Sequence, residues 1–174
     1  GAWGRTSALE RGRILSAIGR KVLDNVELLA ALEVHDVGKP LRQARADAIA
    51  LARYFEFYGG CCDKIHGETL PFAAGYTALT LREPHGVTGH IVPWNYPVEV
   101  MLHKVGQALA TGNTLVVKPA PQTPFNATRL GRLIAEHTDI PPGVVNVVTP
   151  SDNAVAEQLV LSPKVDLISF TGST

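Results

Sequence analysis

The sequence predicts an α/β fold in which a parallel sheet with flanking helices is preceded by a helical segment. Two observations carry this prediction. Residues 1–60 place apolar side chains at the spacings of three and four that are typical of amphipathic helices. From residue 86 onward, short β-branched runs alternate strictly with helical stretches. Because parallel strands need a crossover connection, usually a helix, this alternation indicates a parallel sheet.

The first segment contains three predicted helices. The capping-box sequence Ser7-Ala-Leu-Glu10 opens the first of them. The second spans residues 26–37 and ends at Gly38, a residue type favoured just beyond a helix. The third spans residues 41–58, and Gly59-Gly60 is expected to stop it. Its predicted apolar face consists of Leu41, Ala44, Ala48, Leu51, Phe55 and Tyr58.

The second segment contains four predicted strands separated by three predicted helices. The strands are expected at residues 87–92, 114–117, 144–148 and 167–170, and the helices at about 97–112, 124–137 and 153–161. Pro97 suits the first turn of a helix, and Thr123 is expected to cap the next one. Between the segments, residues 76–82 have strand propensity and are expected to form an arm that pairs outside the main sheet.

Composition narrows the classes of protein. The 174 residues are 45% hydrophobic and 18% charged, which suits one domain or a domain plus part of another. A formal net charge of zero gives no bulk attraction for nucleic acid or an anionic membrane, so neither partner is expected. No apolar run reaches the roughly 20 residues of a membrane helix, and no signal-peptide pattern opens the chain. We therefore expect a cytoplasmic protein.

The two cysteines and six histidines do not predict a reactive or metal-binding centre. Cys61 and Cys62 are adjacent, so they form no disulfide framework. They are interpreted as small, semi-buried thiols at a helix end or loop, because nothing nearby would activate a thiolate. The histidines lack ligand spacing and are interpreted as surface or packing residues. No metal site is expected.

Candidate chemistry lies in the loops after the strands, since ligands of open parallel sheets bind beyond the carboxyl ends of the strands. An amide (Asn95), a lysine (Lys118) and a Gly-Ser turn (Gly172-Ser173) converge on that edge, which indicates a dinucleotide site. Each of these residues also has an interpretation without a role in binding. Asparagine is common in turns, a lysine at a strand end is usually solvated, and a lone glycine turn is weak evidence.

Four segments in order resemble signatures of the aldehyde dehydrogenase family. They are Gly86–Pro97 (GVTGHIVPWNYP), Ala108–Pro119 (ALATGNTLVVKP), Pro141–Val148 (PPGVVNVV) and Phe170–Thr174 (FTGST). Upstream, Gly38-Lys-Pro40 and Tyr54–Tyr58 also look like the family. The resemblance covers nearly the whole chain.

The resemblance implies a Rossmann-like cofactor domain, a catalytic domain and an arm that joins subunits. Residues 1–75 would be the helical part of the cofactor-binding domain, residues 76–85 the start of the oligomerisation arm, and residues 86–174 the first four strand–helix units of the NAD(P)-binding sheet. The sheet would therefore be incomplete here, and the catalytic domain is expected to be absent from this chain. A homodimer or homotetramer is implied for the complete protein.

The implied activity is oxidation of a small-molecule aldehyde to a carboxylic acid with NAD or NADP through a cysteine thioester. Asn95 matches the side-chain donor that stabilises the oxyanion. Cofactor-binding roles are carried over to Ile91, Val92, Pro93, Trp94, Lys118, Ala120, Pro121, Phe170, Gly172 and Ser173. Among these, Lys118 would contact the adenosine ribose, and the last three would open the turn that meets the pyrophosphate.

The sequence departs from the family pattern in three places. Cys61 and Cys62 do not match the motif of the nucleophile, which is expected, with the glutamate base, beyond residue 174. Pro121 stands where an acidic residue is usual, although Gln122 or a later residue remains an alternative ribose contact. The loop at 149–156 lacks glycines that many relatives carry.

Two other functions remain open from the sequence. One is a non-catalytic nucleotide-binding or oligomerisation module. The other is a coenzyme-A-acylating relative, which differs in the acceptor of the thioester. The segment Trp94-Asn95-Tyr96-Pro97 favours water as that acceptor.

Overall fold

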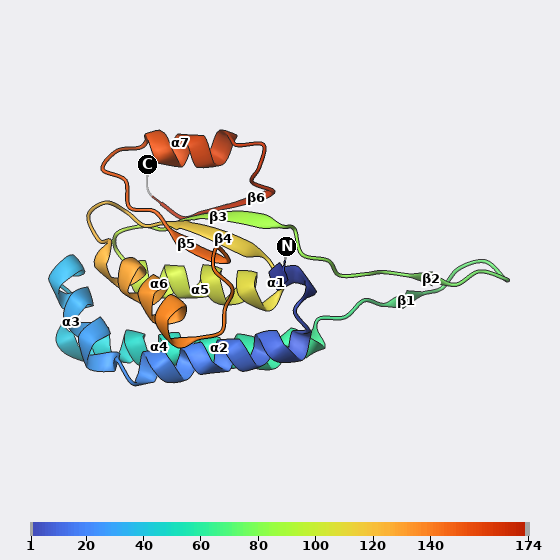
Figure 1. The fold of residues 1–174 in the computed structure, drawn as a ribbon, viewed down its shortest axis with the longest axis horizontal. Coiled ribbons are helices and arrows are strands. Elements are labelled where there is room, and N and C mark those ends of the chain that lie inside the picture. The colour runs from blue at the N-terminus through green and yellow to red at the C-terminus, as the bar shows by residue number, and fades with distance from the viewer. Residues whose placement is uncertain (1, 173–174) are drawn as a thin grey trace.

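The computed structural model describes residues 2–172, and its helices and strands stack in layers (Figure 1). Helices α2 (Ala8–Leu23), α3 (Val26–Val37), α4 (Leu41–Cys61), α5 (Pro97–Ala110), α6 (Phe125–His137) and α7 (Ala154–Leu161) are accompanied by the short helix α1 (Ala2–Arg5) and a 3₁₀ turn, η1 (Cys62–Lys64). The strands are β1 (Thr69–Leu70), β2 (Ala78–Leu79), β3 (Val87–Ile91), β4 (Thr114–Lys118), β5 (Val145–Val147) and β6 (Leu167–Phe170).

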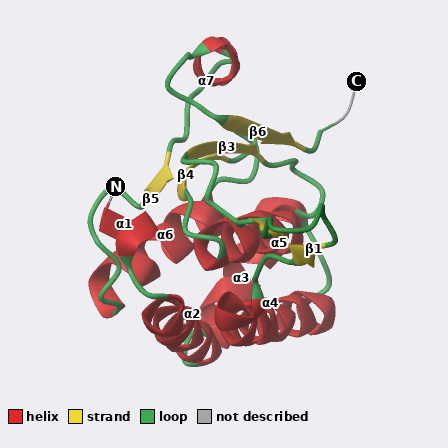
Figure 2. Cartoon of the chain, turned by 90° about the vertical axis from the view of Figure 1, so that its right-hand side faces the viewer, coloured by secondary structure: helices red, strands yellow, loops and turns green. Residues whose placement is uncertain are grey.

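The main sheet is parallel and has the order β5-β4-β3-β6. Helices α5 and α6 cover one face of this sheet, and α7 lies over the other face (Figures 1 and 2). Helices α2, α3 and α4 form a further layer that packs on α5 and α6. The predicted α/β class with a parallel sheet, flanking helices and a preceding helical segment is thus confirmed.

The helical segment and the sheet share one hydrophobic core. Fully buried side chains from α2, α4, α5 and β4, such as Leu15, Phe55, Leu109 and Leu115, belong to the same cluster. Trp3 is also fully buried, and its indole N–H donates to the Leu109 carbonyl at 3.3 Å. Burying side chains of this size stabilises the fold by about 1.5–3 kcal/mol each. The first helices are therefore part of the same folding unit as the sheet.

Local signals in the sequence account for the starts and ends of several helices. Ser7 and Glu10 form the predicted capping box at the start of α2. Helix α3 has the predicted bounds and ends at Gly38, whose φ of 71° lies in the left-handed region that favours glycine. Pro97 occupies the first turn of α5, as predicted. These predictions are confirmed.

The predicted end of the third helix at Gly59-Gly60 is wrong, because α4 continues to Cys61. Gly59 is instead the place where α4 crosses α2. A β-carbon on Gly12 would lie 2.6 Å from the Gly59 carbonyl oxygen, and one on Gly59 would lie 2.9 Å from the Gly12 carbonyl oxygen. The predicted apolar face is otherwise confirmed at its buried centre, whereas Leu41 at its start is 43% exposed.

We expect Gly12→Ala to lower the free energy of unfolding by about 1–3 kcal/mol, because the added methyl forces the α2 and α4 backbones apart. Gly60→Ala is the matched control. A β-carbon there meets nothing within 4 Å, so the exchange should be neutral or stabilise the helix by up to about 1 kcal/mol. Denaturant midpoints of the two variants measure the difference. Equal stability of the two variants would show that α2 and α4 can accommodate the added methyl group without loss of stability.

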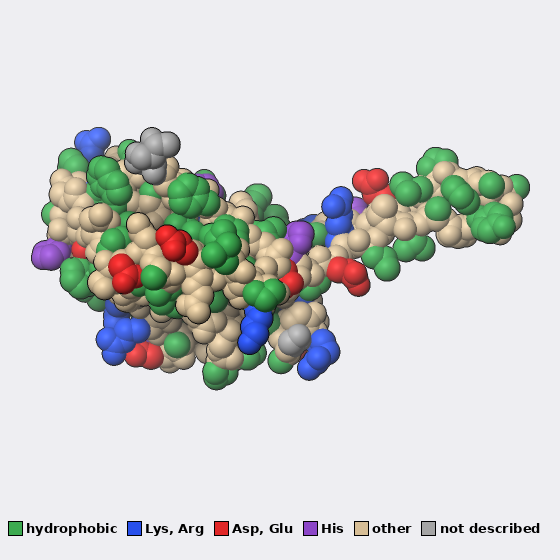
Figure 3. Space-filling view, turned by 90° about the horizontal axis from the view of Figure 1, so that it is seen from above, with side chains coloured by type: hydrophobic (Ala, Val, Ile, Leu, Met, Phe, Trp, Pro, Cys, Tyr) green, Lys and Arg blue, Asp and Glu red, His purple; other side chains and the backbone are tan. Residues whose placement is uncertain are grey.

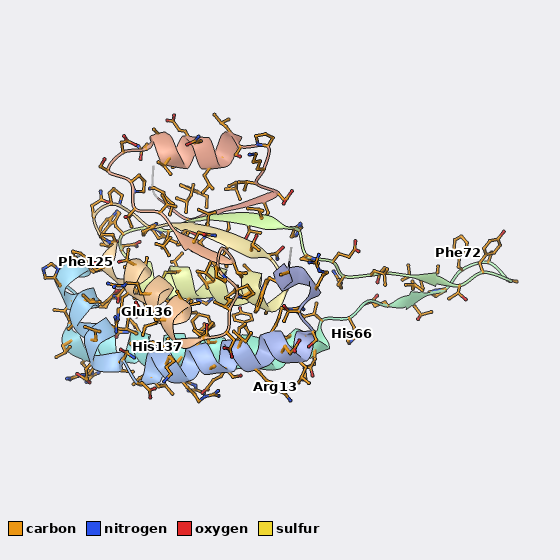
Figure 4. All side chains as sticks on the ribbon, viewed as in Figure 1. Arg13, His66, Phe72, Phe125, Glu136 and His137 are labelled. Carbon is orange, nitrogen blue, oxygen red and sulfur yellow. The ribbon has the colours of Figure 1, made fainter. Side chains whose placement is uncertain are left out.

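The predicted cap of α6 is corrected by the structure. The helix starts at Phe125, Pro124 occupies the capping position, and the hydroxyl of Thr123 is buried without a hydrogen-bond partner among the described residues. The first helical N–H, that of Phe125, donates instead to the carboxylate of Asp36 at the end of α3, at 3.0 Å. Figure 4 shows Phe125 beside α3. The cap is therefore supplied from a distant part of the chain.

An antiparallel hairpin, β1 with β2, projects away from the layered body (Figure 1). This is the arm predicted around residues 76–82, with its partner strand at Thr69–Leu70. Apolar side chains gather along it (Figure 3), and Phe72 lies near its tip (Figure 4). Phe72 is 71% exposed and Leu81 is 75% exposed. Across the described part of the chain, no helix combines the length and the apolar character needed to cross a bilayer.

Candidate functional site

The end of β3 is the centre of the carboxyl edge of the sheet. Ile91 pairs with Lys118 at the end of β4 on one side and with Phe170 at the end of β6 on the other. Backbone hydrogen bonds continue past the strands, from the Val92 N–H to the Lys118 carbonyl at 3.0 Å and from the Thr171 N–H to the Ile91 carbonyl at 3.1 Å. The loops after β3, β4 and β6 therefore leave the sheet side by side.

The loop after β3 presents polar and aromatic groups on a buried support. Val92 is buried, the residues from Trp94 to Tyr96 are exposed, and Pro97 is buried again at the start of α5. None of the described non-glycine residues has a positive φ. Asn95 therefore does not adopt the left-handed conformation that asparagine tolerates in some turns, although it lies in a bend between β3 and α5. Its exposed amide is available to a ligand.

Lys118 lies at the buried end of β4. Only 5% of the residue is exposed, so the interpretation as a solvated strand-end lysine is wrong. The following residues Pro119 and Ala120 are also buried, whereas Pro121 and Gln122 are exposed in the turn that leads to α6. The structure thus holds one ammonium group at the edge of the sheet and leaves the position of Pro121 open to solvent.

The turn after β6 is open on its outer side. Phe170 is 64% exposed, and its ring lies against Gly172, where a β-carbon would be 2.5 Å from the ring. Gly172 itself is exposed, and the nearest side-chain atoms to it belong to that ring. Ser173, the next residue of the predicted turn, lies outside the described residues.

A cavity of about 990 Å³ lies elsewhere, between α5, β6 and the base of the arm. Buried polar groups line it. Burial, and then the positive charge of Lys104, lowers the pKa of His90 to about 4, so the ring is neutral at physiological pH. Burial also lowers the pKa of the Lys104 ammonium, which donates to Ser169 Oγ at 2.7 Å. Asn95 and Lys118 are not among the residues that line this cavity.

The tautomer of His90 follows from its hydrogen bonds. Thr88 Oγ1 lies 2.8 Å from His90 Nε2 and donates its single proton to the Thr114 carbonyl at 3.0 Å. His90 Nε2 must therefore carry the proton, and Nδ1 is the unprotonated nitrogen, which has no partner among the described residues. The sequence interpretation of this histidine as a packing residue agrees with its burial. Among residues 2–172, no three His, Cys, Asp or Glu side chains form a group suited to a metal ion.

A buried ionic cluster next to the edge was missed by the sequence analysis. The Lys39 ammonium donates to Glu33 and Asp47, and both carboxylates are almost fully buried. Burial lowers the pKa of Lys39, but the hydrogen bonds to the two carboxylates outweigh it and leave the pKa above its ordinary value. The sequence did contain a signal for this cluster, because Glu33 and Asp47 are charged residues at apolar-face positions of their helices.

The arrangement suits a ligand with both anionic and aromatic parts, lying across the ends of three parallel strands. A family model for the aldehyde dehydrogenase family matches residues 1–174. The chain belongs to the aldehyde dehydrogenase family.

Individual relatives and solved structures agree with this assignment. The chain is 45% identical to aldehyde dehydrogenase family 2 member B4, mitochondrial, of Arabidopsis thaliana, over 100% of this chain and 32% of that protein. Among solved structures, a putative aldehyde dehydrogenase from Burkholderia cenocepacia superposes with a TM-score of 0.96 at 57% identity, covering 99% of this chain and 36% of that one. PnpE in complex with nicotinamide adenine dinucleotide superposes with a TM-score of 0.93 at 41% identity, covering 99% and 35%. The chain thus spans about a third of the length of these proteins.

Proposed function

We propose that this chain is part of the cofactor-binding unit of an enzyme that oxidises an aldehyde to a carboxylic acid with NAD or NADP. The strand register at the carboxyl edge carries the proposal. It brings the Asn95 loop, Lys118 and the Phe170–Gly172 turn to one edge, in a chain that belongs to this family.

Asn95 is proposed as the oxyanion donor. Negative charge develops on the carbonyl oxygen when a nucleophile adds to an aldehyde, and an N–H donor aimed at that oxygen stabilises the transition state. Asn95 is exposed in the loop that follows the buried strand β3, so its amide is accessible to a substrate oxygen, which suits this role.

The residues at the edge fit a dinucleotide. We assign the wall of the cleft to the backbone from Ile91 to Trp94. We assign a ribose contact to the ammonium of Lys118, a buried residue at the end of β4. Gly172 is exposed and has no side chain, which suits close approach of a pyrophosphate once the Phe170 ring beside it moves. Ala120, after β4, is assigned to the wall of the cofactor site. When bound, the nicotinamide accepts the hydride that leaves the aldehyde carbon. The named complex of PnpE with nicotinamide adenine dinucleotide supports this fit by similarity.

The thiolate that forms the thioester is proposed to lie outside these residues. Burial raises the pKa of the Cys62 thiol, which favours its unreactive protonated form. Cys61 ends helix α4, away from the loops after β3, β4 and β6. In the proposed sequence, the thiolate adds to the aldehyde, hydride leaves to give the thioester, and water replaces the thiolate to release the acid. One aldehyde, one oxidised cofactor and one water thus give one acid, one reduced cofactor and one proton.

The proposed organisation keeps residues 1–75 and 86–174 together as the cofactor-binding part, with an oligomerisation arm between them. The structure supports an arm through the exposed apolar side chains of the hairpin, which an aqueous monomer would leave unpaired. The arm begins earlier than the predicted boundary at residue 76, because its first strand, β1, spans Thr69–Leu70. A homodimer or homotetramer joined by this arm is the proposed assembly. The cytoplasmic location stays a proposal, since one relative is named as mitochondrial.

The test is aldehyde oxidation by the complete protein. When short aliphatic and aromatic aldehydes are added, we expect NAD or NADP to be reduced, which is measured by nicotinamide absorbance. The product should be the carboxylic acid, formed without coenzyme A. The 174-residue chain alone is the control and should show no turnover above background. Turnover by this chain alone would place the chemistry within it. A strict requirement for coenzyme A would instead identify the acylating reaction.

A further inference from the structure

A lysine flanked by two buried carboxylates lies under the loop that carries Asn95. The side chains of Lys39, Glu33 and Asp47 are 8%, 1% and 3% exposed, and the Lys39 ammonium lies 3.0 Å from Glu33 Oε1. Removing charges from water is costly, and a buried ion pair often stabilises a fold no better than apolar residues would. A buried ion pair is therefore weak evidence for a role in stability, and fixing one conformation is an attested alternative use of such groups.

The cluster connects four helices, α3, α4, α5 and α6. Glu33 belongs to α3 and accepts a hydrogen bond at 2.7 Å from Asn126 in the first turn of α6. Asp47 belongs to α4 and accepts from Gln43 at 2.7 Å. Glu99, in the first turn of α5, faces the same group. Burial, and then the negative charge of Asp47, raises the pKa of the Glu99 carboxyl.

The fourth neighbour of Lys39 is an aromatic ring. The ammonium lies 4.6 Å from the ring centroid of Tyr96, within the range of a cation–π interaction. Tyr96 is 47% exposed, so burial does not fix its ring. The cation supplies a fixed contact on one face of the ring instead, because its own position is set by the two carboxylates.

A fixed position of Tyr96 also restricts the backbone of Asn95, the residue before it. Tyr96 is the capping residue of α5, and its carbonyl accepts the Val100 N–H at 3.0 Å. Asn95 precedes it directly, and the backbone on the other side of Asn95 runs back into the buried strand β3. The peptide that carries the Asn95 amide is therefore anchored at one end by the sheet and at the other by Tyr96.

We propose that Lys39, clamped by Glu33 and Asp47, is a positioning residue that holds the Tyr96 ring and thereby sets the direction of the Asn95 amide. The inference rests on the proposed function, in which Asn95 is the oxyanion donor. Lys39 acts through Tyr96 and touches neither substrate nor cofactor.

The test uses two independent perturbations of the complete protein. Lys39→Met leaves a buried excess of negative charge, so it is combined with Asp47→Asn, which restores the net charge of the cluster and leaves Glu33 paired with Asn126. The second perturbation compares Tyr96→Leu, which lacks the ring, with Tyr96→Phe, which keeps it. Lys21→Met is the control, because Lys21 is an exposed lysine in a surface pair with Asp24.

We expect kcat to fall by about 3- to 30-fold in the Lys39→Met/Asp47→Asn protein, the range that a cation–π contact supports, with KM for the cofactor changed by less than about twofold. Tyr96→Leu should lose at least about threefold more kcat than Tyr96→Phe. Lys21→Met should leave kcat unchanged. Equal losses from the two Tyr96 variants, or a folded Lys39→Met/Asp47→Asn protein with full kcat, would overturn the proposal.

A spectroscopic readout separates this inference from the proposed function. Fluorotryptophan placed at Trp94 reports the loop directly by ¹⁹F NMR, and its signal is assigned by its loss in Trp94→Phe. The Lys39→Met/Asp47→Asn exchange should shift or broaden that signal, and Lys21→Met should not. If the unmodified protein oxidises no aldehyde, the proposed function fails while this signal still decides whether Lys39 fixes the loop. An unchanged signal overturns the positioning role.

Discussion

Replacement of Asn95 by alanine in the complete protein is expected to lower kcat about 100- to 1,000-fold, because removal of one oxyanion donor costs about 2.7–4 kcal/mol of transition-state stabilisation. The side chain is exposed at the carboxyl edge and does not support the core. Its loss should therefore leave the fold intact. The KM for the cofactor should change little, since the amide acts on the oxygen of the substrate.

Asn95→Asp is the matched variant, because it keeps the shape of the side chain and replaces the N–H donor with an oxygen. An oxygen facing the developing oxyanion is repulsive, so its kcat should be at least as low as that of Asn95→Ala. Single-turnover measurements isolate the chemical step from product release. Unchanged single-turnover rates in both variants would rule out the oxyanion role and return Asn95 to a turn residue.

The fold was predictable where the determining interactions are local. The capping box at Ser7, the left-handed Gly38 and the proline at the start of α5 each act within one helical turn, so a short window of sequence contains the whole cause. The alternation of strands and helices likewise specifies a parallel sheet through chain connectivity. Strand order was not predicted, because the alternation is the same for several orders of strands.

The predictions failed where the partner of a residue comes from a distant element. Gly59 was interpreted as a helix stop because its local propensity is low, but Gly12 on α2 needs that glycine for close packing. Thr123 is a good capping residue by type, yet Asp36 on α3 supplies the cap. In both cases the tertiary contact outweighs the local preference.

The candidate site was predictable in position but not in environment. The rule that ligands bind beyond parallel strand ends placed Asn95 and Lys118 at one edge, and the register of β3 with β4 agrees. The burial of Lys118 was not foreseen, because burial at a strand end depends on tertiary packing that a short window of sequence does not contain. The Lys39 cluster was missed although Glu33 and Asp47 lie on the apolar faces of their helices, because the ion pairs form only when α3 and α4 pack together.

Cofactor selection is expected to depend on Pro121. In dinucleotide sites an acidic side chain commonly accepts hydrogen bonds from the adenosine ribose hydroxyls, and the same carboxylate repels the extra phosphate of NADP. Proline supplies neither the attraction nor the repulsion, and the exposed turn at Pro121 leaves the position open. The nearby carboxylate of Asp36 is not a substitute, because its side chain is only 2% exposed and accepts the Phe125 N–H.

We therefore expect the complete protein to use NADP, with kcat/KM within about 100-fold of that for NAD, equivalent to at most ~2.7 kcal/mol. Pro121→Glu should restore the carboxylate and shift the ratio toward NAD by about tenfold or more, whereas Pro121→Gln, of similar size but uncharged, should shift it much less. Both cofactors are compared with one good aldehyde at fixed ionic strength, since the effect is electrostatic. A preference for NAD above about 100-fold in the unmodified protein would contradict the role of Pro121. Gln122→Ala would then test the alternative, because loss of that preference identifies Gln122 as the ribose contact.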